Sequence, residues 1–218
     1  MAKNPMFSVV ITTYNRAELV VRALESLLRQ SESDWEGIIV DDGSKDITQE
    51  KLLPYLQSEP RLKYLLKDHS GGTSSKNHGI KASSGKFITF LDSDDEYHPS
   101  HLASRKEFLF RNPGTLFLHG GFKILGNQYV PDIYNPSRMI HLDECVIGGT
   151  FFIERETLLS LGVFRDLSLG SDHDLYQRAR KKNIRMARIE EPTYIYHREN
   201  PNSVTRNIEI IHSRQSGS

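Results

Sequence analysis

The chain has 218 residues, of which 37% are hydrophobic and 26% are charged, so it can bury the core of one α/β domain. Its formal net charge of +0 gives no reason to expect a nucleic-acid partner, and its single cysteine, Cys145, excludes an internal disulfide framework. Neither a signal-peptide pattern nor an apolar run of the roughly 20 residues that a membrane span needs is visible. We therefore expect one soluble unit that works in the cytoplasm.

The first half of the sequence predicts alternating strands and helices. Apolar, β-branched runs are typical of buried strands, whereas apolar residues three and four apart indicate helices. The predicted elements are a strand at 7–11, a helix at 17–30, a strand at 35–40, a helix from Ile47 that Pro54 interrupts or kinks, a strand at 61–66, a loop and helix at 71–82, and a strand at 87–91. This order favours right-handed crossovers and a doubly wound, mostly parallel sheet with helices on both faces.

The stretch from Lys86 to Asp95 is a run of buried character that ends abruptly in carboxylates. In an extended chain Asp92 and Asp94 point to the same side, so their oxygens can converge on one hard cation. The alternative is that Asp94 or Asp95 caps the helix predicted from Pro99 to Phe110 while the other acids are solvated. The residues by themselves leave both interpretations open.

Polar residues also follow the first and second predicted strands, at Thr12 to Asn15 and at Asp41 to Ser44. The carboxyl ends of parallel strands lie at one edge of an open α/β sheet, and ligands bind at that edge. We therefore expect these two stretches and Asp92 to Asp95 to line a single crevice. Each stretch also has a purely structural interpretation, as a half-buried aromatic residue, a helix cap or a turn.

The second half of the sequence is less regular, and we expect it to complete the same domain. The predicted elements are a strand at 116–125, a turn at 126–128, a loop at 135–143, a strand at 145–153, and a helix from Ser171 through Lys182. Glycines in the last of these strands, Gly148 and Gly149, either let a ligand approach the backbone or mark a β-bulge. The chain then divides at about 7–95 and 96–205, with a tail at 206–218.

Three motifs, in their order and spacing, resemble those of a known enzyme family. They are Thr-Thr-Tyr-Asn-Arg at 12–16, Val-Asp-Asp-Gly-Ser at 40–44 and Phe-Leu-Asp-Ser-Asp-Asp at 90–95. No Gly-x-Gly-x-x-Gly follows the first strand, and no Gly-Lys-Ser or Gly-Lys-Thr occurs, so the usual phosphate loops are missing. From Phe7 to about Thr205 the chain resembles an inverting family 2 glycosyltransferase of the GT-A fold.

The resemblance makes 7–95 the half that binds a nucleotide sugar. It implies that Thr12 and Tyr14 frame the nucleotide base and that Asp42 hydrogen-bonds its uracil-like edge. Lys76 stands where the family often has an arginine. A lysine keeps a positive charge near the diphosphate but cannot bind it in a fork, and the alternative is a solvated lysine on a helix face.

The resemblance also implies a divalent cation, Mn²⁺ or Mg²⁺, at the acidic motif. Asp94 would bind the metal and Asp92 would face the ribose side, with Asp92 and Asp95 as further candidate ligands. His197, in a late aromatic-histidine stretch, is another candidate, although a lone histidine beside a strand also has a structural interpretation.

On the acceptor side, at 96–205, the resemblance points to Gly148, Gly149 and Thr150 and to the helix that opens at Ser171. The family usually has a Glu-Asp pair here, and Ser171 takes the Glu position, which leaves Asp172 as the general base. Asp174 lies four residues before Arg178, the spacing of a helical ion pair, so we expect it to serve stability and acceptor positioning.

The implied activity is the metal-dependent, inverting transfer of a sugar from a nucleotide diphosphate, UDP-linked, to a hydroxyl of a saccharide or lipid-linked saccharide. Such a transfer belongs to the assembly of polysaccharides or of glycolipids and other cell-surface glycans. The basic stretch 178–188 either is a solvated helix face or contacts anionic lipid headgroups. The second case would place the protein at the cytoplasmic face of a membrane as a peripheral protein.

Three other functions remain as alternatives. A haloacid-dehalogenase-type phosphatase would carry its Asp-x-Asp motif after the first strand, whereas here the motif follows the fourth predicted strand. A sugar-nucleotide pyrophosphorylase would have a glycine-rich first loop in place of Thr12 to Arg16. A non-catalytic module that binds sugar nucleotides would not need a base such as Asp172.

Overall fold

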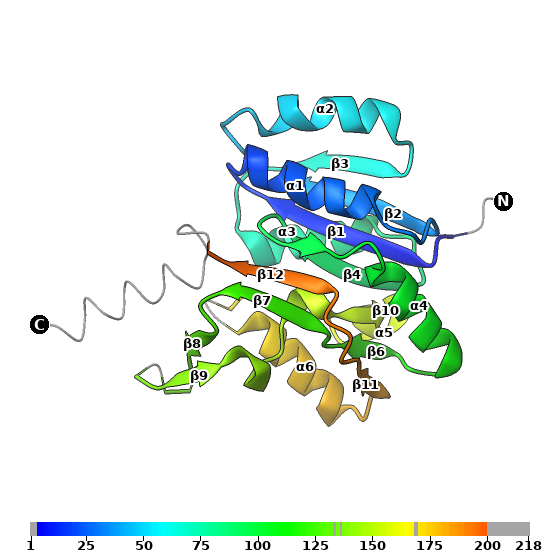
Figure 1. Ribbon diagram of the computed structural model, residues 1–218, viewed down its shortest axis with the longest axis vertical. Coiled ribbons are helices and arrows are strands. Elements are labelled where there is room, and N and C mark those ends of the chain that lie inside the picture. The colour runs from blue at the N-terminus through cyan, green and yellow to red at the C-terminus, as the bar shows by residue number, and fades with distance from the viewer. Residues whose placement is uncertain (1–3, 133, 136, 168–169, 200–218) are drawn as a thin grey trace, which may run out of the picture.

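The computed structural model describes residues 4–132, 134–135, 137–167 and 170–199, and a seven-stranded sheet runs through them (Figure 1). The strand order is β11-β6-β10-β4-β1-β2-β3. The strands are β1 (Phe7–Thr13), β2 (Trp35–Asp41), β3 (Leu62–Leu66), β4 (Phe87–Asp92), β6 (Phe117–His119), β10 (Phe152–Glu154) and β11 (Met186–Arg188).

The half of this sheet made by the N-terminal strands is parallel throughout. β1 pairs in parallel with β2 and β4, and β2 pairs in parallel with β3. The intervening helices are α1 (Ala17–Leu28), α2 (Thr48–Ser58) and α3 (Gly72–Ala82). Antiparallel β10 then joins β4 to the C-terminal part of the sheet. The predicted α/β fold with a doubly wound, mostly parallel sheet is confirmed.

Helices cover both faces of the sheet, and the strands are therefore buried on both sides. Side chains alternate along each strand, so Val9 and Ile11 of β1 pack in one layer while Val10 packs in the other. The first layer receives α1, α2 and α4 (His101–Arg111), and the second receives α3, α5 (Arg155–Ser160) and α6 (Ser171–Lys181). Each core strand faces a hydrophobic layer on both sides, so its sequence is an almost continuous apolar run.

The predicted interruption at Pro54 is wrong, because α2 continues through this residue to Ser58. A proline inside a helix removes the hydrogen bond to the carbonyl four residues earlier, here that of Glu50. Glu50 is exposed, so water can bind the carbonyl that loses its partner. The helix also buries Leu52 fully, and this packing favours the helical conformation.

A second, smaller sheet and a hairpin occupy the C-terminal half. The sheet contains β5 (Glu96–Tyr97), β12 (Tyr194–Arg198) and β7 (Phe122–Gly126), and the hairpin contains β8 (Tyr129–Pro131) and β9 (Met139–His141). Figure 1 shows β12 and β7 side by side, with the β8–β9 hairpin beside them. Among the described helices, none combines the length and the apolar character that crossing a membrane requires.

Three predictions for the second half are wrong. The stretch 116–125 is two strands in different sheets, because Gly120 and Gly121 adopt φ values of 90° and 70° and turn the chain between them. The stretch 135–143 contains β9, and the stretch 145–153 is mostly irregular. Short 3₁₀ turns lie at η1 (Leu142–Glu144) and η2 (Gly148–Thr150), and β10 begins only at Phe152.

Candidate functional site

The carboxyl ends of β1, β2 and β4 meet at one edge of the sheet, as the three polar stretches predicted. Thr13 pairs with Asp41 on β2, and Thr12 pairs with Asp92 on β4. The chain after β1 turns at Asn15, whose φ of 50° is left-handed. The side chain of Asn15 accepts from the Lys45 N–H at 2.7 Å, which ties this turn to the loop after β2. The three polar stretches therefore lie at one edge of the sheet, as predicted.

Asp42 is buried, and its carboxylate binds the loop at 67–71. One oxygen accepts from Lys67 Nζ at 2.5 Å and from the Ser70 N–H at 3.0 Å. The other accepts from the Gly71 N–H at 2.8 Å and lies 2.8 Å from Nδ1 of His69. Burial opposes ionisation, but Lys67 and these N–H groups outweigh it and lower the pKa of Asp42. The predicted contact of Asp42 with uracil stays a prediction, since the contacts described for this carboxylate are all with the protein.

Tyr14 reaches the same loop. Its ring stacks on that of His69 with a centroid separation of 4.0 Å and an interplanar angle of 21°. Tyr14 is 40% exposed, so the pair lies at the surface, where a nucleotide base would have access to it. Lys67 and His69 could not be predicted from the sequence, because the loop that carries them matches none of the motifs.

The acidic motif is paired with basic side chains from other elements. Lys76 Nζ, on α3, lies 3.0 Å from Oδ1 of Asp92, and Arg16 Nη1 lies 3.1 Å from Oδ2 of Asp94. The Lys76 side chain is only 15% exposed, which contradicts the alternative of a solvated lysine. Burial of Asp94 raises its pKa, and the charge of Asp92 adds to this against the opposing effect of Arg16.

Asp95 and His197 form hydrogen bonds and an ion pair with residues of the second sheet. Asp95 accepts from the Tyr194 hydroxyl at 2.5 Å and from the His197 N–H at 2.8 Å. Nε2 of His197 lies 2.9 Å from Oε1 of Glu96. These contacts give both residues a structural role in holding β12, and their role as further metal ligands stays a prediction. No group of three His, Cys, Asp or Glu side chains suited to a metal occurs among residues 4–199 that the structure describes.

Asp92 and Asp94 nevertheless fit a divalent cation of the kind that the resemblance implies. Mg²⁺ and similar ions commonly take one or two protein carboxylates and complete their coordination with water and substrate phosphates. The raised pKa of Asp94 reflects a buried carboxyl group beside a second acid. A cation shared with a diphosphate would favour the ionised form of both acids.

Asp172 lies in the first turn of α6 and accepts from the Gly148 N–H at 3.1 Å. A Cβ atom at position 148 would lie 2.4 Å from the Asp172 carboxyl carbon, so only glycine fits this approach. Burial raises the pKa of Asp172, and Lys76 opposes the rise while Asp92 adds to it. Lys76 thus interacts electrostatically with both Asp92 and Asp172 and links the two sides of the site.

The other predicted acceptor-side residues contact neighbouring groups of the protein, and their role toward an acceptor stays a prediction. Asp174 lies 2.8 Å from Nε of Arg178 and 3.3 Å from Nη1 of Arg165, which confirms the predicted helical ion pair. A Cβ atom at Gly149 would meet the Tyr194 hydroxyl at 2.1 Å. The Thr150 hydroxyl donates to the Ile147 carbonyl at 2.7 Å and accepts from the Gly120 N–H at 3.1 Å.

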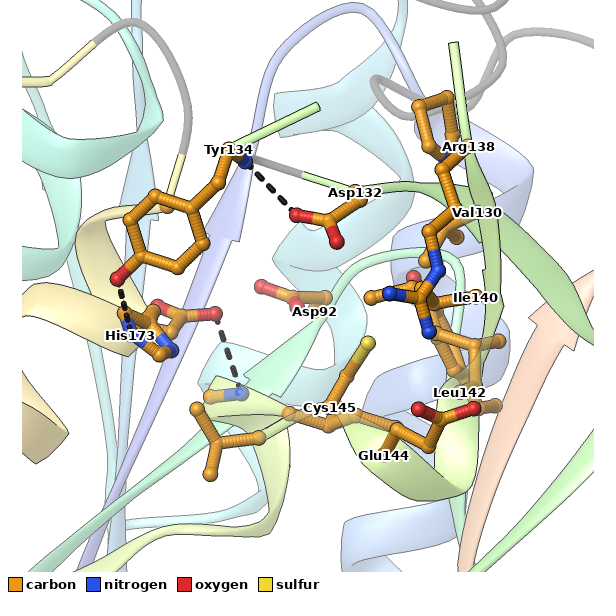
Figure 2. A pocket seen from close by; sticks show the side chains of 17 residues that line it. Asp92, Val130, Asp132, Tyr134, Arg138, Ile140, Leu142, Glu144, Cys145 and His173 are labelled. Carbon is orange, nitrogen blue, oxygen red and sulfur yellow. Dashed lines mark hydrogen bonds between the residues drawn. The ribbon is translucent and has the colours of Figure 1, made fainter. Parts of the chain in front are cut away.

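A cavity of 380 Å³ opens beside Asp172 and Asp92, between the β8–β9 hairpin and the start of α6 (Figure 2). Of the predicted acceptor-side residues, only Gly148 lines it. Its remaining walls are Val130, Pro131, Asp132, Tyr134, Arg138, Ile140, Leu142, Glu144, Cys145, Val146, Ile147, Gly170, His173 and Tyr196. Most of these residues belong to the irregular stretch from β8 to η2, where no pattern in the sequence indicated a pocket.

The chain is similar to known glycosyltransferases in sequence and in fold. WfgD of Escherichia coli, a UDP-Glc:alpha-D-GlcNAc-diphosphoundecaprenol beta-1,3-glucosyltransferase, is 29% identical over 160 residues, which cover 71% of this chain and 62% of WfgD. The S. aureus TarS 1-349 complex with UDP-GlcNAc has a TM-score of 0.74 and 20% identity, over 91% of this chain and 60% of TarS 1-349.

The mannosyltransferase PcManGT of Pyrobaculum calidifontis, in complex with GDP-Man and Mn²⁺, has a TM-score of 0.73 and 20% identity, over 97% of this chain and 61% of PcManGT. This chain therefore spans about three fifths of the length of WfgD, TarS 1-349 and PcManGT. The solved structures share its fold, which is the GT-A fold. The family model for glycosyl transferase family 2 matches residues 8–140, more than half of the chain, so the chain belongs to glycosyl transferase family 2.

Proposed function

We propose that this chain transfers a sugar from a UDP-linked donor to a hydroxyl group of an acceptor, with inversion and with the help of a divalent cation. The observation that carries the proposal is the position of Asp172. Its carboxyl group lines the cavity together with Asp92, and Lys76 links the two acids. A direct displacement needs a base on one side of the reacting sugar and a diphosphate site on the other.

The donor binds at the edge formed by β1, β2 and β4. Tyr14 supports the base, and Lys76 and Arg16 are the cations nearest to the acids of the motif. Asp94, with Asp92, would hold the divalent cation. When bound, the cation offsets the negative charge that grows on the departing diphosphate. The PcManGT complex contains Mn²⁺, and the TarS complex contains UDP-GlcNAc, which supports this donor chemistry.

The acceptor enters through the cavity, and Asp172 takes its proton. The acceptor oxygen forms a bond to the anomeric carbon as the bond from that carbon to the diphosphate breaks, and the hydroxyl proton goes to the Asp172 carboxylate. One such displacement inverts the anomeric configuration. The raised pKa of Asp172 suits this role, because a carboxylate with a raised pKa is a stronger base.

We further propose a saccharide or lipid-linked saccharide as the acceptor, in the assembly of cell-surface glycans. The name of WfgD gives it an acceptor that is a GlcNAc on diphosphoundecaprenol, which supports this class. An acceptor of that kind would bring the enzyme to the cytoplasmic face of a membrane as a peripheral protein.

Incubation with a panel of nucleotide sugars tests the proposal. Release of nucleoside diphosphate should be fastest with a UDP-sugar, should require a divalent cation and should rise when lipid-linked saccharides are added. A non-catalytic binding module would bind the nucleotide without releasing it from the sugar. Release that is unaffected by Asp172→Asn would show that the assigned base is wrong.

A further inference from the structure

The outer part of the cavity carries polar side chains that the proposed transfer step does not use. Asp132 and Arg138 belong to the β8–β9 hairpin, and Glu144 belongs to η1 (Figure 2). Tyr134 spans the rim, where its hydroxyl lies 2.9 Å from Nε2 of His173 on α6. Arg138 and Glu144 are both exposed, so their charged groups are accessible to a ligand entering the cavity.

Acids outnumber bases in the lining of this cavity. Carboxyl groups come from Asp92, Asp132, Glu144 and Asp172, whereas Arg138 contributes the guanidinium group and Lys76 lies behind Asp92. Cys145 adds no charge near neutral pH, because burial raises the pKa of its thiol. An anionic ligand would therefore meet like charges here, in addition to those of the donor diphosphate.

Carboxylates and a guanidinium group around an apolar wall are suited to a ligand rich in hydroxyl groups. An ionised carboxylate only accepts hydrogen bonds and a guanidinium group only donates them, so together they satisfy both sides of a hydroxyl group. Val130, Leu142 and Ile147 form a buried cluster at the wall, which can take the C–H face of a sugar ring. The volume of 380 Å³ is near the lower end of the roughly 300–1,000 Å³ of small-molecule sites.

We infer that this cavity binds a sugar without negative charge at the end of the acceptor, and that Asp132, Glu144 and Arg138 select that sugar through its hydroxyl groups. The inference rests on the proposed transfer reaction and adds the class of sugar that is accepted. Charged parts of the acceptor, such as the diphosphate of a lipid carrier, lie outside the cavity. The three side chains are specificity residues, and none of them takes part in the bond-making step.

Binding of simple glycosides, measured by saturation-transfer NMR titration, tests the inference. The probes are neutral methyl glycosides of common hexoses and N-acetylhexosamines, with glucuronic acid and glucosamine as anionic and cationic counterparts. Each titration is run with and without UDP and Mn²⁺, so that the result does not depend on donor binding. At least one neutral glycoside and glucosamine should both bind more tightly than glucuronic acid, because only the anionic sugar meets like charges in the cavity.

Variants connect such binding to the cavity. Glu144→Ala should weaken binding of that glycoside about tenfold, or roughly 1.4 kcal/mol, because a charge-assisted hydrogen bond to the sugar is lost. Asp132→Ala should do the same, although Asp132 also accepts from the Tyr134 N–H at 2.8 Å, so its variant additionally loosens the hairpin. Glu107→Ala is the matched control, because Glu107 is an exposed acid on α4 that pairs with Arg111.

Three results would overturn the inference. They are tighter binding of glucuronic acid than of every neutral glycoside, no binding of any neutral glycoside, and equal binding by the Glu144→Ala, Asp132→Ala and Glu107→Ala variants. UDP titrations of the same proteins separate this outcome from failure of the proposed function. If UDP binds but neutral glycosides do not, only the assignment of the acceptor cavity is wrong.

Discussion

Lys76 lies between the two acids on which the proposed chemistry depends. Its ammonium group is 3.0 Å from Asp92 and 5.9 Å from the ring centroids of both Phe90 and Phe164. Burial disfavours the charge of Lys76, but Asp92 and Asp172 outweigh it and raise the pKa of the lysine. One cation therefore steadies the ionised forms of an acid on the donor side and of the base on the acceptor side.

Asp172→Asn should keep donor binding and lower turnover by roughly 10²–10⁴, the usual effect of removing a general base. The amide is nearly isosteric and can still accept from the Gly148 N–H, so the local structure is retained. Asp174→Asn is the matched control, since it breaks the ion pairs with Arg178 and Arg165 and should act mainly on stability. Turnover and UDP affinity are measured for both variants, and near-normal turnover of Asp172→Asn with intact donor affinity would move the base elsewhere.

Lys76→Met should shift the pH dependence of kcat/KM. Asp172 acts as a base only when it is ionised, so activity falls as the pH drops through its raised pKa. Removing the positive charge of Lys76 disfavours the ionised form further, which moves the acidic limb of the profile to higher pH. The measurement is a pH–rate profile of both proteins, and a limb at the same pH in the variant would show that Lys76 does not act on the base.

At the scale of elements, the approach of η2 to the start of α6 builds the acceptor side. Gly148 supplies a backbone N–H to Asp172, and the N-terminus of α6 favours an ionised carboxylate in its first turn. The contact joins residues 24 positions apart, so no local sequence pattern could predict it. The sequence identified Asp172 and Gly148 separately, by resemblance, while their contact emerges only from the fold.

Gly148→Ala should reduce both stability and turnover. The added methyl group would lie 2.4–2.5 Å from the Asp172 carboxyl atoms, and overpacking of this kind costs about 1–3 kcal/mol. Gly72→Ala is the control, because a Cβ atom there meets nothing within 4 Å. Thermal unfolding and turnover are compared, and a Gly148→Ala protein as stable and active as Gly72→Ala would contradict the close contact.

The strands differ in how well the sequence predicts them. β1, β2 and β4 have six or seven residues that are almost all buried, so their apolar runs are visible without a structure. β6, β10 and β11 have three residues each, too few to show a period. The first half of the fold was therefore predictable in detail, whereas the boundaries in the second half depend on pairing between distant segments.

Across the whole molecule, the main sheet and the second sheet meet at the acidic motif. Asp92 belongs to the end of β4, while Asp95, three residues later, holds β12 through Tyr194 and the His197 N–H. Asp92 of the motif thus belongs to the candidate ligand site, whereas Asp95 connects β4 to β12. The sequence placed the acids correctly at the strand end, but their division depends on β12, which arrives about 100 residues later and was predicted only as a late aromatic stretch.

The proposed transfer requires that a nucleotide diphosphate bind at this strand end together with a divalent cation held by Asp94. Calorimetric titration of UDP with Mn²⁺ or with chelator, in the parent and in Asp94→Ala, tests this claim. The parent should bind UDP more tightly with Mn²⁺, and Asp94→Ala should lose about tenfold or more in affinity, or roughly 1.4 kcal/mol, and show little difference on adding chelator. Equal UDP binding by the parent and the variant, with and without Mn²⁺, would contradict the claim.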